Sequence, residues 1–146
     1  MPHIHRSALL PFSDSQMFAL VNDIRAYPQY MDGCVGADVH EASLSQMRAT
    51  LFLEKHGVAM QFTTNNQLDA PKSIIMTLEQ GPFAEFSGQW FFQSLRADAC
   101  KVILDLQFTL ANPISGFVVG KLFDGIANHM VDSVVMRAKA IYGKTP

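Results

Sequence analysis

The fold is decided by residues 114–142, ISGFVVGKLFDGIANHMVDSVVMRAKAIY. Apolar side chains recur along this stretch every three or four residues, from Phe117 to Ile141, which is the spacing of an amphipathic α-helix. At a rise of about 1.5 Å per residue, the predicted helix is roughly 40 Å long or more, enough to cross a whole β-sheet. Asn112-Pro113 ends the preceding segment, and Gly143 suits the position just beyond the helix.

Two glycines lie inside the predicted helix, Gly120 and Gly125. Each glycine in a helix interior costs roughly 0.8–1 kcal/mol relative to alanine. Two explanations are open at this point. The glycines allow close packing against another element, or they leave room beside the helix for a ligand.

Upstream of the helix, residues 34–108 change to a period of two, in which apolar residues recur at every second position. This alternation is typical of antiparallel strands that have one face on a core and one face in solvent. We predict six consecutive strands in this region and a further strand over residues 3–10. Turn signals separate the apolar runs at His56-Gly57, 69–72, Gly81-Pro82 and 96–98.

A helix start follows the first predicted strand. Ser13 and Gln16 have the spacing of a capping box, which predicts a helix over residues 14–24. Proline disfavours helix in the residue that precedes it, so Pro28 indicates that this helix ends before Tyr27. Residues 27–31 are predicted to form one further short helical turn.

The order of these elements predicts an α+β fold, formed as one domain over residues 1–146. A curved antiparallel sheet of about seven strands wraps around the long C-terminal helix. Because a twisted sheet curves and a helix is a straight rod, we expect an elongated apolar pocket between them, the alternative being that Phe and Met side chains fill the space. The expected ligand-binding residues are Leu51, Leu53, Met60, Phe62, Met76, Leu78, Trp90, Phe92, Leu104, Leu106, Phe123, Ile126, Met130 and Val134, with Tyr27, Tyr30 and Met31 at the pocket entrance.

The composition narrows the classes of function. The chain has 146 residues, 11 basic and 13 acidic, a net charge of −2, and 49% hydrophobic residues. This balance excludes disorder and argues against a DNA partner bound by net positive charge. Cys34 and Cys100 form no CxxC pair, and no apolar run is long enough to span a membrane. We expect a cytoplasmic protein.

The sequence shows none of the common catalytic or metal-binding motifs. His3 and His5 have a spacing that can hold a metal, but no third ligand is evident, so we expect surface histidines and no metal. Asp105 is expected to face away from the pocket. Among the inward-facing positions only Thr64 and Asn66 are polar. This lining favours a binding function over catalysis, and we expect that the protein requires no cofactor.

The ordered set of short motifs along the chain resembles the coenzyme-Q-binding START-like family. This family includes ribosome association toxins and mitochondrial ubiquinone-binding proteins, within the helix-grip superfamily of polyketide cyclases and lipid-transfer domains. The similarity extends over about residues 3–143. The residues that carry it are Arg6-Ser7, Leu20-Val21-Asn22-Asp23, Tyr27-Pro28, Phe62-Thr63-Thr64-Asn65, Gly81-Pro82-Phe83, Gly88-Gln89-Trp90-Phe91-Phe92, Ala99-Cys100-Lys101-Val102, Met130-Val131-Asp132 and Arg137-Ala138-Lys139.

The resemblance implies a helix-grip fold and non-enzymatic binding of a hydrophobic isoprenoid lipid, foremost ubiquinone, by a carrier or chaperone that supports respiration. Such a protein makes transient contact with a membrane surface, peripheral to the inner membrane. The alternative implied is a toxin of a toxin–antitoxin pair that binds the large ribosomal subunit and blocks subunit association. Its candidate ribosome contacts are Lys101, Arg137 and Lys139, together with Lys144. A polyketide cyclase or dehydratase is the third hypothesis.

Overall fold

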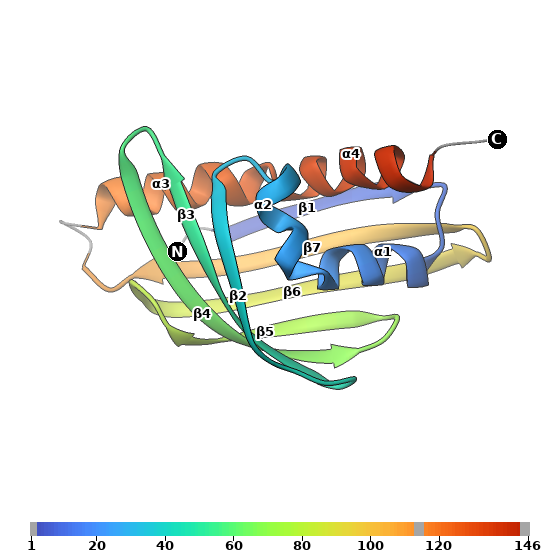
Figure 1. Cartoon of the computed structure of the whole chain (residues 1–146), viewed down its shortest axis with the longest axis horizontal. Helices are drawn as coiled ribbons and strands as arrows, with labels where there is room; N and C mark the ends of the chain where they lie inside the picture. Colours follow the sequence, from blue (N-terminus) through green and yellow to red (C-terminus); the bar gives the residue numbers. More distant parts are fainter. Residues whose placement is uncertain (1–2, 113–115, 144–146) are drawn as a thin grey trace.

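The computed structural model describes residues 3–112 and 116–143. Seven strands form one antiparallel sheet, as the alternation predicts, and their order across the sheet is β1-β7-β6-β5-β4-β3-β2 (Figure 1). The first strand in sequence therefore pairs with the last. The strands are β1 (His3–Leu10), β2 (Cys34–Ala42), β3 (Gln46–Lys55), β4 (Val58–Asp69), β5 (Ser73–Gln80), β6 (Phe83–Arg96) and β7 (Ala99–Leu110).

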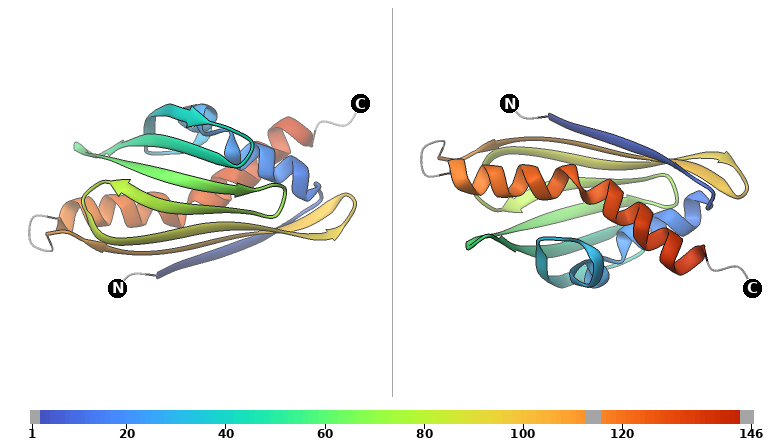
Figure 2. Two further views of the ribbon diagram at one scale, coloured as in Figure 1. Left: turned by 90° about the horizontal axis from the view of Figure 1, so that it is seen from below. Right: turned by 90° about the horizontal axis from the view of Figure 1, so that it is seen from above.

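The sheet bends around the C-terminal helical segment. Strands β2, β3 and β4 cross the direction of β1, β6 and β7 steeply in Figure 1. Helix α3 (Phe117–Asn128) contacts β1 at one edge of the sheet and also β3 and β4 near the other edge. Figure 2, which views the molecule from below and from above, shows that the helical segment runs across the sheet. The expected fold, a curved sheet gripping a terminal helix, is confirmed.

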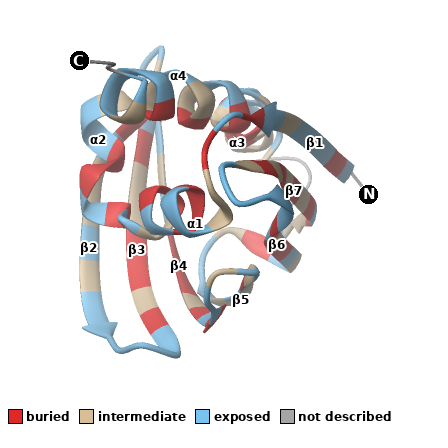
Figure 3. Cartoon of the chain, turned by 90° about the vertical axis from the view of Figure 1, so that its right-hand side faces the viewer, coloured by how far each residue is buried: buried red, intermediate tan, exposed pale blue. Residues whose placement is uncertain are grey.

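The core occupies the concave side of the sheet. In β7, Cys100, Val102, Leu104, Leu106 and Phe108 are all buried, and the residues between them are more exposed. Figure 3 shows bands of buried and more exposed residues along β3 as well. Both cysteines, Cys34 and Cys100, are buried free thiols.

The predicted hairpin turn at His56-Gly57 is confirmed. His56 has a φ of 54° and Gly57 a φ of 77°. Positive φ at both central residues is the geometry of a type I′ turn, whose twist matches that of the flanking strands. The turn fixes the register in which Leu51 pairs with Phe62 and Ala49 with Thr64, so these four side chains reach the concave face together.

The capping box of the first helix is also confirmed. The Gln16 amide donates to Ser13 Oγ at 3.1 Å, and the Ser13 amide donates to Gln16 Oε1 at 3.0 Å. Helix α1 (Asp14–Asn22), however, ends before the predicted residue 24, because Asp23 has a non-helical ψ of 72°. A 3₁₀ turn, η1 (Ile24–Ala26), and the short helix α2 (Tyr27–Tyr30) follow; the helical turn predicted near Pro28 is therefore confirmed.

The predicted C-terminal helix consists of two segments, α3 and α4 (Met130–Tyr142). The predicted long C-terminal helix is confirmed, and its two segments meet at His129, whose amide donates to Ile126, three residues back, at 3.1 Å. The Asn128 side chain donates to the Asp124 carbonyl, and Ser133 Oγ donates to the His129 carbonyl. Such side-chain bonds to the helix backbone bend helices, and Figure 2 shows the change in axis. Residues 114 and 115 of the predicted helix lie outside the described residues.

The two helix glycines have different surroundings. A Cβ at Gly120 would lie 3.0 Å from Leu110 Cδ2, whereas a Cβ at Gly125 would have no neighbour within 4 Å. Gly120 therefore corresponds to the close-packing explanation. Gly125 borders open space and lines a shallow groove together with Val58, Lys121 and His129.

We predict that Gly125→Ala raises the free energy of unfolding by about 1 kcal/mol, because alanine restricts the unfolded backbone and meets no obstacle in the helix. Gly120→Ala gains less or loses stability, because Leu110 must move. Urea denaturation of the two variants beside the parent protein measures the difference. Equal gains for both substitutions would contradict this account of the glycines.

Candidate functional site: an apolar pocket with a polar end

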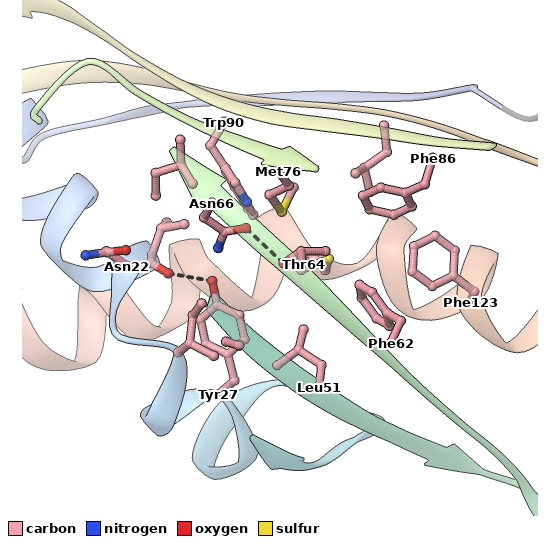
Figure 4. A pocket seen from close by; sticks show the side chains of 16 residues that line it. Asn22, Tyr27, Leu51, Phe62, Thr64, Asn66, Met76, Phe86, Trp90 and Phe123 are labelled. Carbon is pink, nitrogen blue, oxygen red and sulfur yellow. Dashed lines mark hydrogen bonds between the residues drawn. The ribbon is translucent and has the colours of Figure 1, made fainter. Parts of the chain in front are cut away.

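A pocket lies inside the curve of the sheet, where strands β3–β7 approach α1, η1 and the junction of α3 with α4 (Figure 4). Its free volume is about 40 Å³, room for about three water molecules at the roughly 10–15 Å³ that each requires on this measure. The lining residues are Val21, Asn22, Ile24, Tyr27, Ala49, Leu51, Phe62, Thr64, Asn66, Ile74, Met76, Phe86, Trp90, Leu106, Phe123 and Met130.

Half of the predicted ligand-binding residues line this pocket. They are Leu51, Phe62, Met76, Trp90, Leu106, Phe123 and Met130. The other seven are placed elsewhere. Phe92, Leu104 and Val134 belong to the solid core, and Leu78 packs against it. Leu53 and Met60 line a shallow groove on β3 and β4, and Ile126 lines the groove beside Gly125.

Of the three predicted entrance residues, only Tyr27 lines the pocket. Its hydroxyl donates to the Val21 carbonyl at 2.5 Å, which joins α2 to α1. Tyr30 packs edge-on against Tyr27 and lies beneath the Arg137 guanidinium, 5.1 Å from its ring centre. Met31 is buried at 4% exposure. Tyr30 and Met31 therefore connect α2 to its neighbours and do not line the hollow.

Sequence reasoning missed the contribution of the first helix. Val21, Asn22 and Ile24 close the pocket on one side, whereas the prediction formed its walls from the sheet and the C-terminal helix and placed only the residues near Pro28 at its entrance. A usable signal was present, since Val21 and Ile24 lie on the apolar face of the predicted N-terminal helix. Ala49, Ile74 and Phe86 were also missed, although they follow the strand alternation.

One end of the pocket is polar. Thr64 and Asn66, the inward polar residues expected from the sequence, are both buried, and Thr64 Oγ1 donates to Asn66 Oδ1 at 2.8 Å. Asn22 and Tyr27 lie at the same end in Figure 4. The Asn22 Oδ1 atom is buried without a hydrogen-bond partner. An unsatisfied buried acceptor costs roughly 1–3 kcal/mol, so this end of the pocket is suited to a ligand or water that donates a hydrogen bond.

The other end of the pocket is aromatic. Phe123 of α3 packs edge-on against Phe62, Phe83 and Phe108, with ring centres 5.6, 5.0 and 4.8 Å away. Phe86 lies beside the same rings, 5.8 Å from Phe62. Edge-to-face pairs of this kind contribute roughly 0.5–1.5 kcal/mol each beyond their burial. The cluster closes one end of the hollow with rigid apolar surface.

Gly88 determines how the middle of the pocket is filled. A Cβ at this position would lie 2.6 Å from Leu106 Cδ2 and 2.7 Å from Met76 Cε. The missing side chain thus gives Met76 and Leu106 the space they occupy against β6. Methionine is unbranched and changes rotamer easily, so Met76 and Met130 are the side chains whose movement would enlarge the hollow.

The pocket carries no group that titrates near neutral pH among the described residues that line it. Tyr27 is its one ionisable residue, and burial raises the pKa of its phenol well above the ordinary value. General acid–base catalysis needs a group whose pKa lies near the working pH. The lining can therefore enclose an apolar body and hydrogen-bond a polar group, but it offers no proton-transfer residue.

The three predicted ribosome contacts that the structure describes do not form one cluster. Arg137 Nη2 donates to Gln29 Oε1 of α2 at 3.0 Å, and Lys139 is exposed on the same helix. Lys101 lies between the buried residues Cys100 and Val102 and so points to the outer face of the sheet. Lys144 lies outside the described residues. His129 is exposed near Asp132 and does not line the pocket.

Known proteins resemble this chain over nearly its whole length. The family model described as polyketide cyclase/dehydrase and lipid transport matches residues 10–135. The ribosome association toxin RatA of Pseudomonas aeruginosa is 46% identical over 141 residues, 97% of this chain and 98% of that protein. The persistence and stress-resistance toxin PasT of Escherichia coli O6:H1 is 41% identical over 142 residues, 97% of this chain and 90% of that protein.

A solved structure has the same architecture. A START superfamily protein from Mycobacterium smegmatis superposes with a TM-score of 0.77, covering 95% of this chain and 98% of that one at 23% identity. No helix within residues 3–112 and 116–143 has the length and apolar character needed to span a membrane. The family match, the relatives and the observed helix-grip fold agree: the chain belongs to the polyketide cyclase/dehydrase and lipid transport family, of START-like fold.

Proposed function

We propose that this protein is a toxin that binds the large ribosomal subunit and thereby blocks association of the two ribosomal subunits. The observation that carries the proposal is the 46% identity with a ribosome association toxin over 97% of this chain. The second relative, also named a toxin, covers the same share of the chain. A ribosomal partner implies a cytoplasmic site of action.

Ribosomal RNA presents phosphates, which attract cationic side chains. With a net charge of −2, the protein needs a local basic surface for this contact. We assign that surface to the C-terminal half of α4, which carries Arg137 and Lys139 within one helical turn. Arg137 is held in place by Gln29 and by the Tyr30 ring, so its guanidinium is ordered before binding, and Lys139 is exposed two positions further along the helix.

We predict that the double variant R137A/K139A loses about tenfold or more in affinity for isolated large subunits, measured by co-sedimentation. Affinity falls as salt concentration rises, and each lost phosphate contact reduces the magnitude of the slope of log affinity against log salt by roughly 0.7–0.9. The affinity of the double variant therefore depends less steeply on salt. Lys72→Ala, at an exposed turn between β4 and β5, is the matched control and leaves binding unchanged.

Circular dichroism of the double variant checks that the loss of the Gln29 contact has not disturbed the fold. Parent protein that fails to sediment with large subunits at low salt would overturn the proposal of ribosome association. Equal binding by the parent and the double variant would overturn the assignment to α4, and Lys101→Ala then tests the outer face of the sheet.

We propose that the protein is not an enzyme and requires no cofactor for this role. The support is the chemistry of the pocket, whose lining residues include no carboxylate, imidazole, amine or thiol. Cyclase and dehydratase reactions need proton transfer at the substrate. Asn22, Thr64 and Asn66 form hydrogen bonds but do not exchange protons near neutral pH.

A second candidate function is binding of a hydrophobic isoprenoid such as ubiquinone, which would allow transient contact with a membrane surface. The apolar lining favours an apolar tail, and the unpartnered Asn22 Oδ1 at the polar end would accept a hydrogen bond from a hydroxyl of the reduced quinol, whereas the carbonyl oxygens of the quinone donate none. The present volume of about 40 Å³ is far below the roughly 150 Å³ that accommodates a benzene ring. Binding therefore requires Met76 and Met130 to turn aside, a cost offset by about 0.8 kcal/mol for each ligand CH₂ removed from water.

Trp90 is the one tryptophan of the chain, and it lines the pocket. We predict that a short-chain ubiquinone quenches its fluorescence saturably. Gly88→Ala weakens this binding at least tenfold, because the added methyl group forces Met76 and Leu106 toward the hollow. Ser87→Ala, on the exposed face of the same strand, has no effect.

Thermal unfolding of the Gly88→Ala protein checks that it is folded at the temperature of the titration. Absence of saturable quenching in the parent protein would refute quinone binding and leave the ribosomal proposal intact. Equal quenching in the parent and in Gly88→Ala would place the quinone outside the pocket.

A further inference from the structure

Two adjacent strands bring three potential metal ligands to the outer face of the sheet. In β1, Ile4 is buried, so His3 and His5 point outward, and in β7, Asp105 points outward between the buried Leu104 and Leu106. The register pairs His5 directly with Asp105. Residues that are two apart on one strand share a face, so His3 comes to the same place.

The three side chains already converge. His3 Nε2 lies 2.5 Å from Asp105 Oδ1, and His5 Nδ1 lies 3.9 Å from Asp105 Oδ2. One ligand atom from each residue lies within 4.8 Å of the other two. Asp105 thus supplies the third ligand that the spacing of His3 and His5 lacks in the sequence, from a strand about a hundred residues away.

We propose that His3, His5 and Asp105 bind one divalent transition-metal ion of the zinc class. Metal–ligand distances of about 2.0–2.2 Å in a tetrahedral site require ligand atoms roughly 3.3 Å apart. The observed separations of 2.5 and 3.9 Å, which run from the two imidazoles to different oxygens of Asp105, lie on either side of this value. The side chains of His3 and His5 are 48% and 61% exposed, so their torsions adjust freely, and water completes the coordination.

The donor set indicates which metals bind. Imidazole nitrogens suit Zn²⁺, Cu²⁺ and Ni²⁺, whereas Mg²⁺ and Ca²⁺ prefer sites made of oxygen atoms. The carboxylate of Asp105 offsets part of the charge of the ion. A bound metal would connect the edge strand β1 to β7 on the outer face of the sheet. The same strand is already joined to α3, because Arg6 donates a hydrogen bond to Asn128 Oδ1 at 2.8 Å.

Isothermal titration of the untagged protein with Zn²⁺ tests the site, and Co²⁺ absorbance reports its ligands. We expect one ion for each chain. His3→Ala, His5→Ala and Asp105→Asn each weaken binding by roughly tenfold or more, because each removes one of three protein ligands. Mg²⁺ does not compete.

His129→Ala is the matched control, because His129 Nδ1 also lies 3.9 Å from a carboxylate oxygen, that of Asp132, but without a second histidine in the pair. It leaves the affinity for Zn²⁺ within twofold of the parent. The substituted histidines are exposed and the Asp105 side chain is 28% exposed, and Trp90 fluorescence confirms that each variant is folded. Absence of saturable Zn²⁺ binding, or an equal loss in the His129→Ala protein, would overturn the proposal.

Discussion

The packing of Phe123 inside the bend of the sheet is the contact on which the rest of the structure depends. Its ring meets Phe62 of β4, Phe83 of β6 and Phe108 of β7, so one helical side chain joins strands from both parts of the bent sheet. A flat sheet would bring only neighbouring strands to one helix. Because the strands twist, distant strands meet the same helix turn, and the space left beside this contact becomes the pocket.

The small size of the hollow follows from the side chains that fill it. Met76 and Leu106 occupy the space that Gly88 leaves against β6, and Met130 covers the hollow from the helical side. Flexible side chains keep most of the packing contacts of a closed core and can still rearrange at moderate cost. At the polar end of the pocket, by contrast, one hydrogen-bond acceptor is unsatisfied, because Asn22 Oδ1 is buried without a partner. A ligand that donates a hydrogen bond there would remove this cost, whereas a purely apolar ligand would not.

The alternation of residues and the turn signals were sufficient to predict the sheet, because a period of two defines both the strand and its buried face. The same rule could not predict the pocket in full. It shows that Leu104 and Leu106 face inward, but not that Leu106 lies beside the hollow and Leu104 in solid core. Whether an inward-facing residue lines the hollow or lies in solid core depends on how the sheet bends. The break at His129 was missed for a related reason, since its cause lies in side-chain bonds from Asn128 and Ser133 within an otherwise regular apolar pattern.

One strand can serve two sites because its side chains alternate between faces. In β7, Leu106 lines the pocket, and its neighbour Asp105 faces the histidines of β1 on the outer surface. A slip of one residue in the pairing of β7 would turn the carboxylate into the apolar core and expose the leucines. The burial of an unpaired carboxylate is strongly unfavourable, so Asp105 helps to fix the register that forms the pocket. The surface cluster and the interior hollow are thus two consequences of the same strand alignment.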